Sequence, residues 1–163
     1  MNLQQFFAEL DRYPGAVPLR DLVALQRRLA ITPDDVKSHL NFGDTCYRRN
    51  LLRNGQGYQA WILCWKPGQA SPIHDHRGSA CGVLVLQGAC TETVFHQEAD
   101  GMLREGKTRT LPLGDVCGSY DSDIHEIRND GDEPLVTLHV YTPPLATMGI
   151  YSRETAAVSL WTP

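Results

Sequence analysis

The chain has 163 residues, of which 42% are hydrophobic and 21% are charged, and its formal net charge is −4. These values are ordinary for one globular domain that buries its own core. The small negative charge, without a basic run, argues against a nucleic-acid-binding protein. No apolar stretch of the sequence reaches the roughly 18 residues that a membrane-spanning helix needs.

The cysteines and the first residues of the chain indicate where the protein works. The five cysteines are scattered without a CxxC pair, and their odd number favours reduced thiols. The sequence begins without the basic segment and apolar segment of a signal peptide. We therefore expect a cytoplasmic monomer that binds neither nucleic acid nor membrane and whose partners are small molecules.

Residues 1–43 are predicted to be helical. A first helix is indicated by apolar residues at i, i+3, i+4 and i+7, namely Leu3, Phe6, Phe7 and Leu10. A second helix is expected over 19–29. Thr32 as N-cap, Pro33 at the first helical position and acids after it predict a third, short helix. We expect these helices to pack on the outside of the rest of the domain.

Residues 44–163 are predicted to be β-structure. Short runs rich in β-branched and aromatic residues alternate with Gly, Pro, Asn and Asp turns. The predicted strands are 45–53, 58–65, 71–75, 81–87, 90–97, 102–110, 115–119, 123–129, 134–141 and 156–161. This spacing is typical of a sandwich or barrel, not of a parallel sheet with crossover helices. No linker or repeat divides the chain, so 1–163 is predicted to be a single domain of the mostly β class.

Two histidines, His74 and His76, lie two residues apart at the end of the predicted strand 71–75, with His76 as the next residue along the same extended chain. Since the side-chain period of a strand is two, both imidazoles leave the same face and can chelate one metal ion. Asp75 then points away. Without further context, a pair of exposed strand histidines is an equally good interpretation.

The residues around this pair resemble the two motifs of the cupin superfamily. The first motif matches Gly68, His74, His76 and Gly88, with Cys81 where most cupins carry glutamate. The second motif matches Gly106, Pro112, Gly114, His125 and Asn129, with a longer gap before the histidine. The resemblance implies a jelly-roll β-barrel in which His74, His76 and His125 converge on one metal ion.

The residue at position 81 decides what such a site can do. Three neutral imidazoles without a carboxylate leave open positions on the ion, and imidazole suits Zn, Cu, Fe and Ni alike. If Cys81 is a fourth ligand, the site is closed and better suited to structural Zn. The spacing leaves both alternatives open.

The β-rich part also resembles the cysteine dioxygenase type I family. The matching stretches are 47–51, 62–65, 71–76, 86–88, 92–95 and 138–144. The resemblance implies an enzyme that oxidises L-cysteine with O2 to cysteine sulfinic acid. It also implies that the cofactor is a mononuclear non-haem Fe(II) held by His74, His76 and His125.

The same resemblance implies roles for five further residues. Arg49 binds the substrate carboxylate and Tyr47 supports it, while His139 and Tyr141 act beside the metal. Cys81 matches a cysteine that some members join through sulfur to the tyrosine that corresponds to Tyr141. A thioether between Cys81 and Tyr141 is therefore a hypothesis for this chain. The residues themselves agree, because 47 and 49 share one strand face, as do 139 and 141. A cis bond before Pro143 is one way to aim Tyr141 inward.

Two alternative functions stay open at this point. The first is a dioxygenase for 3-mercaptopropionate, although relatives of that kind tend to carry glutamine where this chain has Arg49. The second is a non-catalytic cupin that holds Zn through the three histidines and Cys81.

Overall fold

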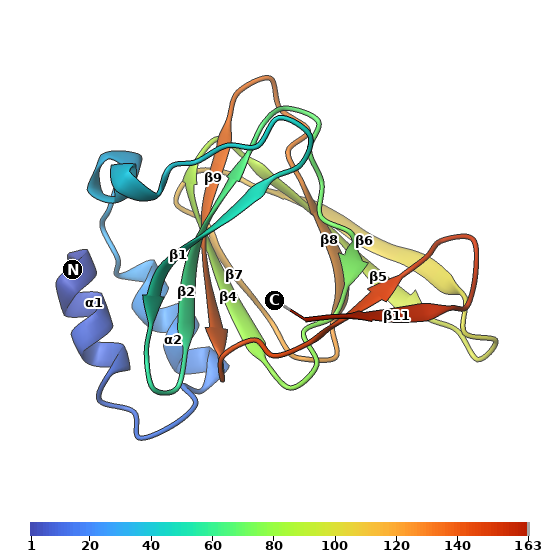
Figure 1. Cartoon of the computed structure of the whole chain (residues 1–163), viewed down its shortest axis with the longest axis horizontal. Helices are drawn as coiled ribbons and strands as arrows, with labels where there is room; N and C mark the ends of the chain where they lie inside the picture. Colours follow the sequence, from blue (N-terminus) through green and yellow to red (C-terminus); the bar gives the residue numbers. More distant parts are fainter. Residues whose placement is uncertain (163) are drawn as a thin grey trace.

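The computed structural model describes residues 1–162, in which three helices precede the strands (Figure 1). The helices are α1 (Leu3–Leu10), α2 (Leu19–Arg27) and the 3₁₀ helix η1 (Pro33–His39). Asn2 and Gln5 form a reciprocal capping box at the start of α1. The N–H of Thr32 donates to Asp35 at the start of η1. All three predicted helices are confirmed.

The described residues form eleven strands. These are β1 (Arg48–Asn54), β2 (Gln59–Trp65), β3 (Ile73–His74), β4 (Ala80–Gln87), β5 (Cys90–Gln97), β6 (Leu103–Leu111), β7 (Val116–Ser119), β8 (Ile124–Arg128), β9 (Leu135–Thr142), β10 (Met148–Tyr151) and β11 (Val158–Trp161). Every predicted strand is present, but β10 was not predicted. Its four residues show no clear alternation, and pairing with β3 and β11 holds them extended.

The strands form two antiparallel sheets that face each other. One sheet has the order β1-β2-β9-β4-β7, and the other has the order β11-β10-β3-β8-β5-β6. Figure 1 shows them as the two walls of a jelly roll, with α1 and α2 outside the first sheet. The predicted mostly β fold with helices packed outside is confirmed. Within residues 1–162 the two ladders stay separate, so hydrogen bonds do not close them into one barrel.

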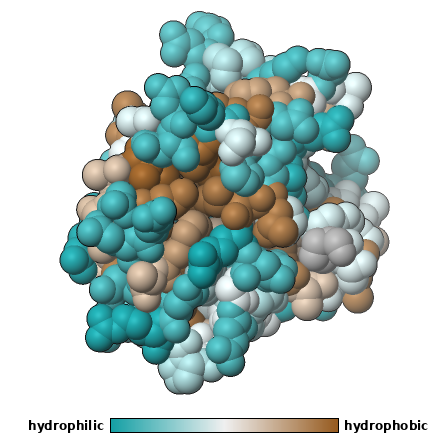
Figure 2. Space-filling view, turned by 60° about the vertical axis from the view of Figure 1, so that its left-hand side comes forward, coloured by the Kyte–Doolittle hydropathy of each residue, from teal (hydrophilic) through white to brown (hydrophobic). Residues whose placement is uncertain are grey.

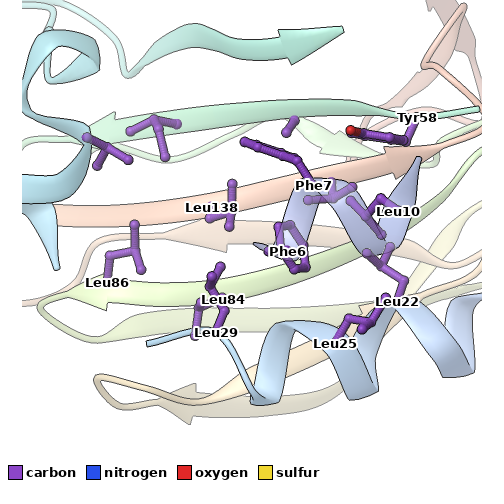
Figure 3. Close-up of a cluster of buried hydrophobic side chains, with 14 of the residues drawn as sticks. Phe6, Phe7, Leu10, Leu22, Leu25, Leu29, Tyr58, Leu84, Leu86 and Leu138 are labelled. Carbon is purple, nitrogen blue, oxygen red and sulfur yellow. The ribbon is translucent and has the colours of Figure 1, made fainter. Parts of the chain in front are cut away.

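Strand β9 divides the core because its alternate side chains face opposite ways. Val136, Leu138 and Val140 belong to the cluster on the helical side, where Phe6 and Leu22 are fully buried. Figure 3 shows leucines and phenylalanines of the two helices pointing at the sheet. Viewed from this side, apolar residues gather in the middle of the face and hydrophilic residues surround them (Figure 2). Hydrophobic burial therefore holds the helices against the sheet.

The other face of β9 points between the two sheets. Thr137, His139 and Tyr141 are all at most 4% exposed there. The peptide bond between Thr142 and Pro143 is cis, as hypothesised from the sequence. A polar row in an otherwise apolar interior marks this space as the place for a functional site.

None of the helices in the described part of the chain is both long and apolar enough to span a bilayer.

Candidate metal centre and substrate cavity

Three buried histidines meet between the sheets. One ligating atom each from His74, His76 and His125 lies within 4.8 Å of the other two. His74 and His125 are directly opposite each other on β3 and β8. Strand β3 ends at His74, so His76 belongs to the following turn, where its N–H donates to the carbonyl of Asp121. The predicted trio therefore converges, although β3 is shorter than the predicted strand 71–75.

Hydrogen bonds on the outer ring nitrogens orient two of these imidazoles. Nδ1 of His74 is 2.8 Å from the carbonyl of Pro72, and Nδ1 of His125 is 2.9 Å from a carboxylate oxygen of Glu92. Both partners accept hydrogen bonds, which assigns the ring proton to Nδ1 and leaves a lone pair on Nε2. Nε2 of His74 lies 3.2 Å from Nε2 of His76, and Nε2 of His125 is buried without a partner. Nitrogen lone pairs this close to one another fit a shared cation.

Burial keeps the rings of His74 and His76 neutral. Burial lowers the pKa of His74 to about 3, and the neighbouring His125 contributes in the same direction. Burial also lowers the pKa of His76 well below its ordinary value. Neutral imidazole is the form that binds metals, so His74 and His76 present ligands without proton competition near neutral pH. Imidazole donors suit iron as they suit several other transition metals.

Glu92 is a buried partner of this centre that the sequence did not single out for a role. It lies on β5, is 2% exposed, and contacts His125 through one oxygen and Arg109 through the other, 2.6 Å from Nε. Burial pushes the pKa of Glu92 upward, but hydrogen bonding to His125 and the charge of Arg109 outweigh burial, so the pKa is lowered. The sequence gives no sign of this contact, because 33 residues separate Glu92 from His125. The pairing of β5 with β8 brings the two side chains together.

Arg49 lies beside the histidines with unused hydrogen-bond donors. Its Nε and Nη2 are buried and have no hydrogen-bond partner. Its guanidinium carbon is 5.0 Å from the ring of Trp61, 5.5 Å from that of Tyr141 and 5.1 Å from that of Trp161. Aromatic faces attract the cation but accept no strong hydrogen bond, so its charge and its free N–H groups suit an anionic ligand.

A cavity of about 540 Å³ opens at Arg49. Its walls include Tyr47, Met148, Ile150 and Trp161, so β10 and β11 form one side. Trp161 lines this cavity and is 40% exposed. The side chain of Tyr141 connects the cavity to the metal centre, because its ring contacts Arg49 and packs 5.3 Å from that of His76.

A chain of contacts joins Tyr47 to His139. The ring of Tyr47 stacks on Trp65 at 4.0 Å, and Nε1–H of Trp65 donates to the hydroxyl of Thr137. That hydroxyl is 3.0 Å from Nε2 of His139. Because the Thr137 oxygen accepts a hydrogen bond from Trp65, its own O–H can donate to Nε2 of His139. This arrangement assigns the imidazole proton of His139 to Nδ1. Thr137 had no predicted role, and it fixes the orientation of His139.

Cys81 and Tyr141 are directly opposite each other on β4 and β9, and both are almost fully buried. Sγ of Cys81 lies 3.9 Å from Nδ1 of His139. Burial raises the pKa of both the Cys81 thiol and the Tyr141 phenol well above their ordinary values. Cys81 is not part of the histidine group found in the described residues, which argues against the closed four-ligand site.

Asp75 faces away from the metal centre, as expected, but it is buried. Its carboxylate accepts hydrogen bonds from the N–H of Gly149 and the hydroxyl of Tyr151. These bonds fasten the turn that carries His76 to β10. Strand β10, which was not predicted, therefore helps to hold the metal centre in place.

Comparison with known proteins agrees with this geometry. A family model described as cysteine dioxygenase type I matches residues 7–154. The chain belongs to the cysteine dioxygenase type I family. Cysteine dioxygenase type 1 of Rattus norvegicus is 32% identical over 145 residues, which cover 85% of this chain and 72% of that protein. The protein of the same name from Bos taurus is 30% identical over 160 residues, with 94% and 76% covered.

Solved structures show the same fold in more distant proteins. A Klebsiella pneumoniae protein with a double-stranded β-helix domain has a TM-score of 0.58 and 20% identity, with 72% of this chain and 94% of that chain covered. The cupin domain of Schizosaccharomyces pombe Cnp3 has a TM-score of 0.54 and 15% identity, with 66% and 71% covered. These two proteins thus share the jelly roll of this chain.

Proposed function

We propose that this chain is a thiol dioxygenase that converts L-cysteine and O2 to cysteine sulfinic acid at a mononuclear non-haem Fe(II). The observation that carries the proposal is the meeting of three buried imidazoles with a guanidinium whose buried Nε and Nη2 have no hydrogen-bond partner in the protein. Family membership supplies the reaction class. Both atoms of O2 enter the sulfinate, so the thiol supplies all the electrons and no external reductant is needed.

His74, His76 and His125 would hold the iron ion. Three nitrogen ligands leave further positions for a thiolate and for O2, and the bound ion supplies the chemistry that lets the two react. The protein contributes by fixing the rings through Pro72 and Glu92 and by surrounding them with buried side chains.

Arg49 would bind the carboxylate of the substrate. A planar guanidinium can donate two parallel N–H bonds to a carboxylate, and the two unpartnered nitrogens of Arg49 are placed to do so. Tyr47 would support this end of the cavity. With the carboxylate held there, the short side chain of cysteine reaches toward the histidines, which holds the thiol in a reactive position.

Tyr141 and His139 would act next to the reacting sulfur. The raised pKa keeps the phenol of Tyr141 protonated, so it can donate a hydrogen bond to a developing negative charge. His139, held neutral by burial, is fixed through Thr137. These residues orient and donate, and they exclude water from the site.

Cys81 and Tyr141 would form the thioether. Bond formation between Sγ and the phenol ring removes one hydrogen from each residue and two electrons in total, which dioxygen would accept. Their positions opposite each other on neighbouring strands support this proposal.

A comparison of three thiols tests the proposed function. Fe(II)-loaded protein is mixed in turn with L-cysteine, 3-mercaptopropionate and cysteamine, and O2 consumption and products are measured. L-Cysteine should react fastest and consume one O2 for each sulfinate formed. Faster reaction of 3-mercaptopropionate would assign that substrate instead. Tightly held zinc with no thiol-dependent O2 uptake would contradict an enzymatic role.

We also propose a cytoplasmic location. All five cysteines are free thiols, which suits a reducing compartment.

A further inference from the structure

The three histidines differ in what holds their outer nitrogens. His74 is bonded to a neutral carbonyl, and Nδ1 of His76 has no hydrogen-bond partner in the described chain. His125 alone is paired with a carboxylate, that of Glu92. Negative charge therefore reaches the centre through one imidazole only.

Glu92 is held so that it cannot easily turn away. It is buried on β5, and register pairs it with Ile127 of β8 on one side and Arg109 of β6 on the other. One oxygen faces His125 and the other faces Nε of Arg109. A buried carboxylate without partners is costly, so these two contacts define its position.

We infer that Glu92 is a positioning residue for His125 that supplies, through the imidazole, the negative charge that the centre lacks at Cys81. This inference rests on the proposed iron site. A carboxylate bonded to the outer nitrogen of a ligand histidine fixes its tautomer and makes the ring a stronger donor. The charge stays one residue away from the metal, so no coordination position is used and room remains for thiol and O2.

Arg109 sets how much of that charge reaches His125. Its guanidinium pairs with Glu92, and its side chain is 41% exposed. The three residues form a path of charge from the surface to the centre. Removal of Arg109 therefore leaves the carboxylate less neutralised and strengthens its influence on the imidazole, whereas neutralisation of Glu92 weakens that influence.

Two substitutions with opposite expected effects test the inference. Glu92→Gln keeps an oxygen that can accept from His125 but removes the charge, and Arg109→Gln keeps the carboxylate but removes its counter-charge. Fe(II) affinity is measured anaerobically by chelator competition, and the Fe(III)/Fe(II) midpoint potential is measured without substrate. Arg104→Gln is the matched control, because Arg104 also lies on β6 and pairs with Glu98, which does not contact the histidines.

Glu92→Gln should lower Fe(II) affinity by about 10- to 100-fold and raise the potential. Arg109→Gln should lower the potential, and Arg104→Gln should change neither quantity. A merely structural role would not move the potential in opposite directions. Unchanged affinity in Glu92→Gln, or shifts of the same sign in both variants, would overturn the inference.

Two precautions keep the result decisive. If Glu92→Gln does not fold, the exposed Arg109→Gln variant decides alone, and an unchanged or raised potential would refute the inference. Neither measurement uses a thiol, so failure of wild-type protein to oxidise L-cysteine would count against the proposed function only.

Discussion

Arg49 shows how one residue is made to need a ligand. Its guanidinium contacts three aromatic rings, and two of its nitrogens are buried without hydrogen bonds. Buried donors of this kind are costly unless a ligand pairs them. The proposed substrate carboxylate would accept hydrogen bonds from these nitrogens.

Substitution of Arg49 by Gln should weaken the reaction of L-cysteine. Loss of charge-assisted hydrogen bonds worth about 1.5–3 kcal/mol corresponds to a fall of roughly 10- to 150-fold in kcat/KM. Steady-state O2 uptake measures the change. Cysteamine, which has no carboxylate, is the control substrate and should lose little. Unchanged KM and kcat for L-cysteine would show that Arg49 does not bind substrate.

The Cys81–Tyr141 thioether is a second prediction at this scale. The intact mass after turnover with iron, L-cysteine and O2 should fall by two hydrogens, and peptide mapping should place the loss on these two residues. Cys81→Ala and Tyr141→Phe should each abolish the loss. A full, unmodified mass after many turnovers would count against the bond.

Among the elements, α1 is fastened to the hairpin of β1 and β2 by a small polar and aromatic contact. The Tyr58 hydroxyl donates to Asp11 at 2.8 Å, and Arg53 pairs with the same carboxylate. The Tyr58 ring stacks against Phe7 at 6.1 Å. Burial, with the hydrogen bond to Asp11, raises the pKa of Tyr58 to about 12.

This contact should make stability sensitive to alkaline pH. An unfolded tyrosine loses its proton near pH 10, whereas folded Tyr58 keeps its proton to about pH 12. The folded state binds more protons in this window, so the free energy of unfolding should fall as pH rises through it. Urea unfolding at several pH values measures the slope. Tyr58→Phe should reduce this slope, whereas Tyr120→Phe, at an exposed tyrosine, should not. The same slope in Tyr58→Phe as in the wild-type protein would show that Tyr58 is not the group responsible.

The two faces of the sheet that contains β9 have different roles, apolar packing on the helical side and the candidate site on the inner side. The helix-facing side of β9 carries the apolar Val136, Leu138 and Val140, and the inner side carries Thr137, His139 and Tyr141. The helical layer therefore stabilises the sheet without touching the histidines. That residues 1–163 act as one monomeric domain stays a prediction.

Leu138→Ala tests this separation. Leu138 is fully buried between the sheet and the helices, so its truncation should lower the free energy of unfolding by about 2–5 kcal/mol. Metal affinity measured well below the unfolding transition should not change. Leu51→Ala, at a side chain that is 46% exposed, is the control for unfolding. A large loss of metal affinity in folded Leu138→Ala protein would show that the two faces are coupled.

Local pattern was sufficient for much of this protein. The strands follow from the alternation of side chains, the helices from apolar spacing and caps, and the histidine trio from two motifs. Each strand, helix and motif depends on residues close together in the chain, so it can be recognised in the sequence directly. The roles proposed for Arg49 and Tyr141 came from the family resemblance of short stretches of sequence, and they stay predictions.

Only the folded chain decided which distant side chains meet. Glu92 with His125, Trp161 with Arg49, and β10 with Asp75 join segments whose separation along the chain carries no pattern. Their contacts arise from the registers of neighbouring strands and from two sheets closing on each other. Side-chain periodicity is a local property, whereas packing between sheets is set by the whole molecule at once.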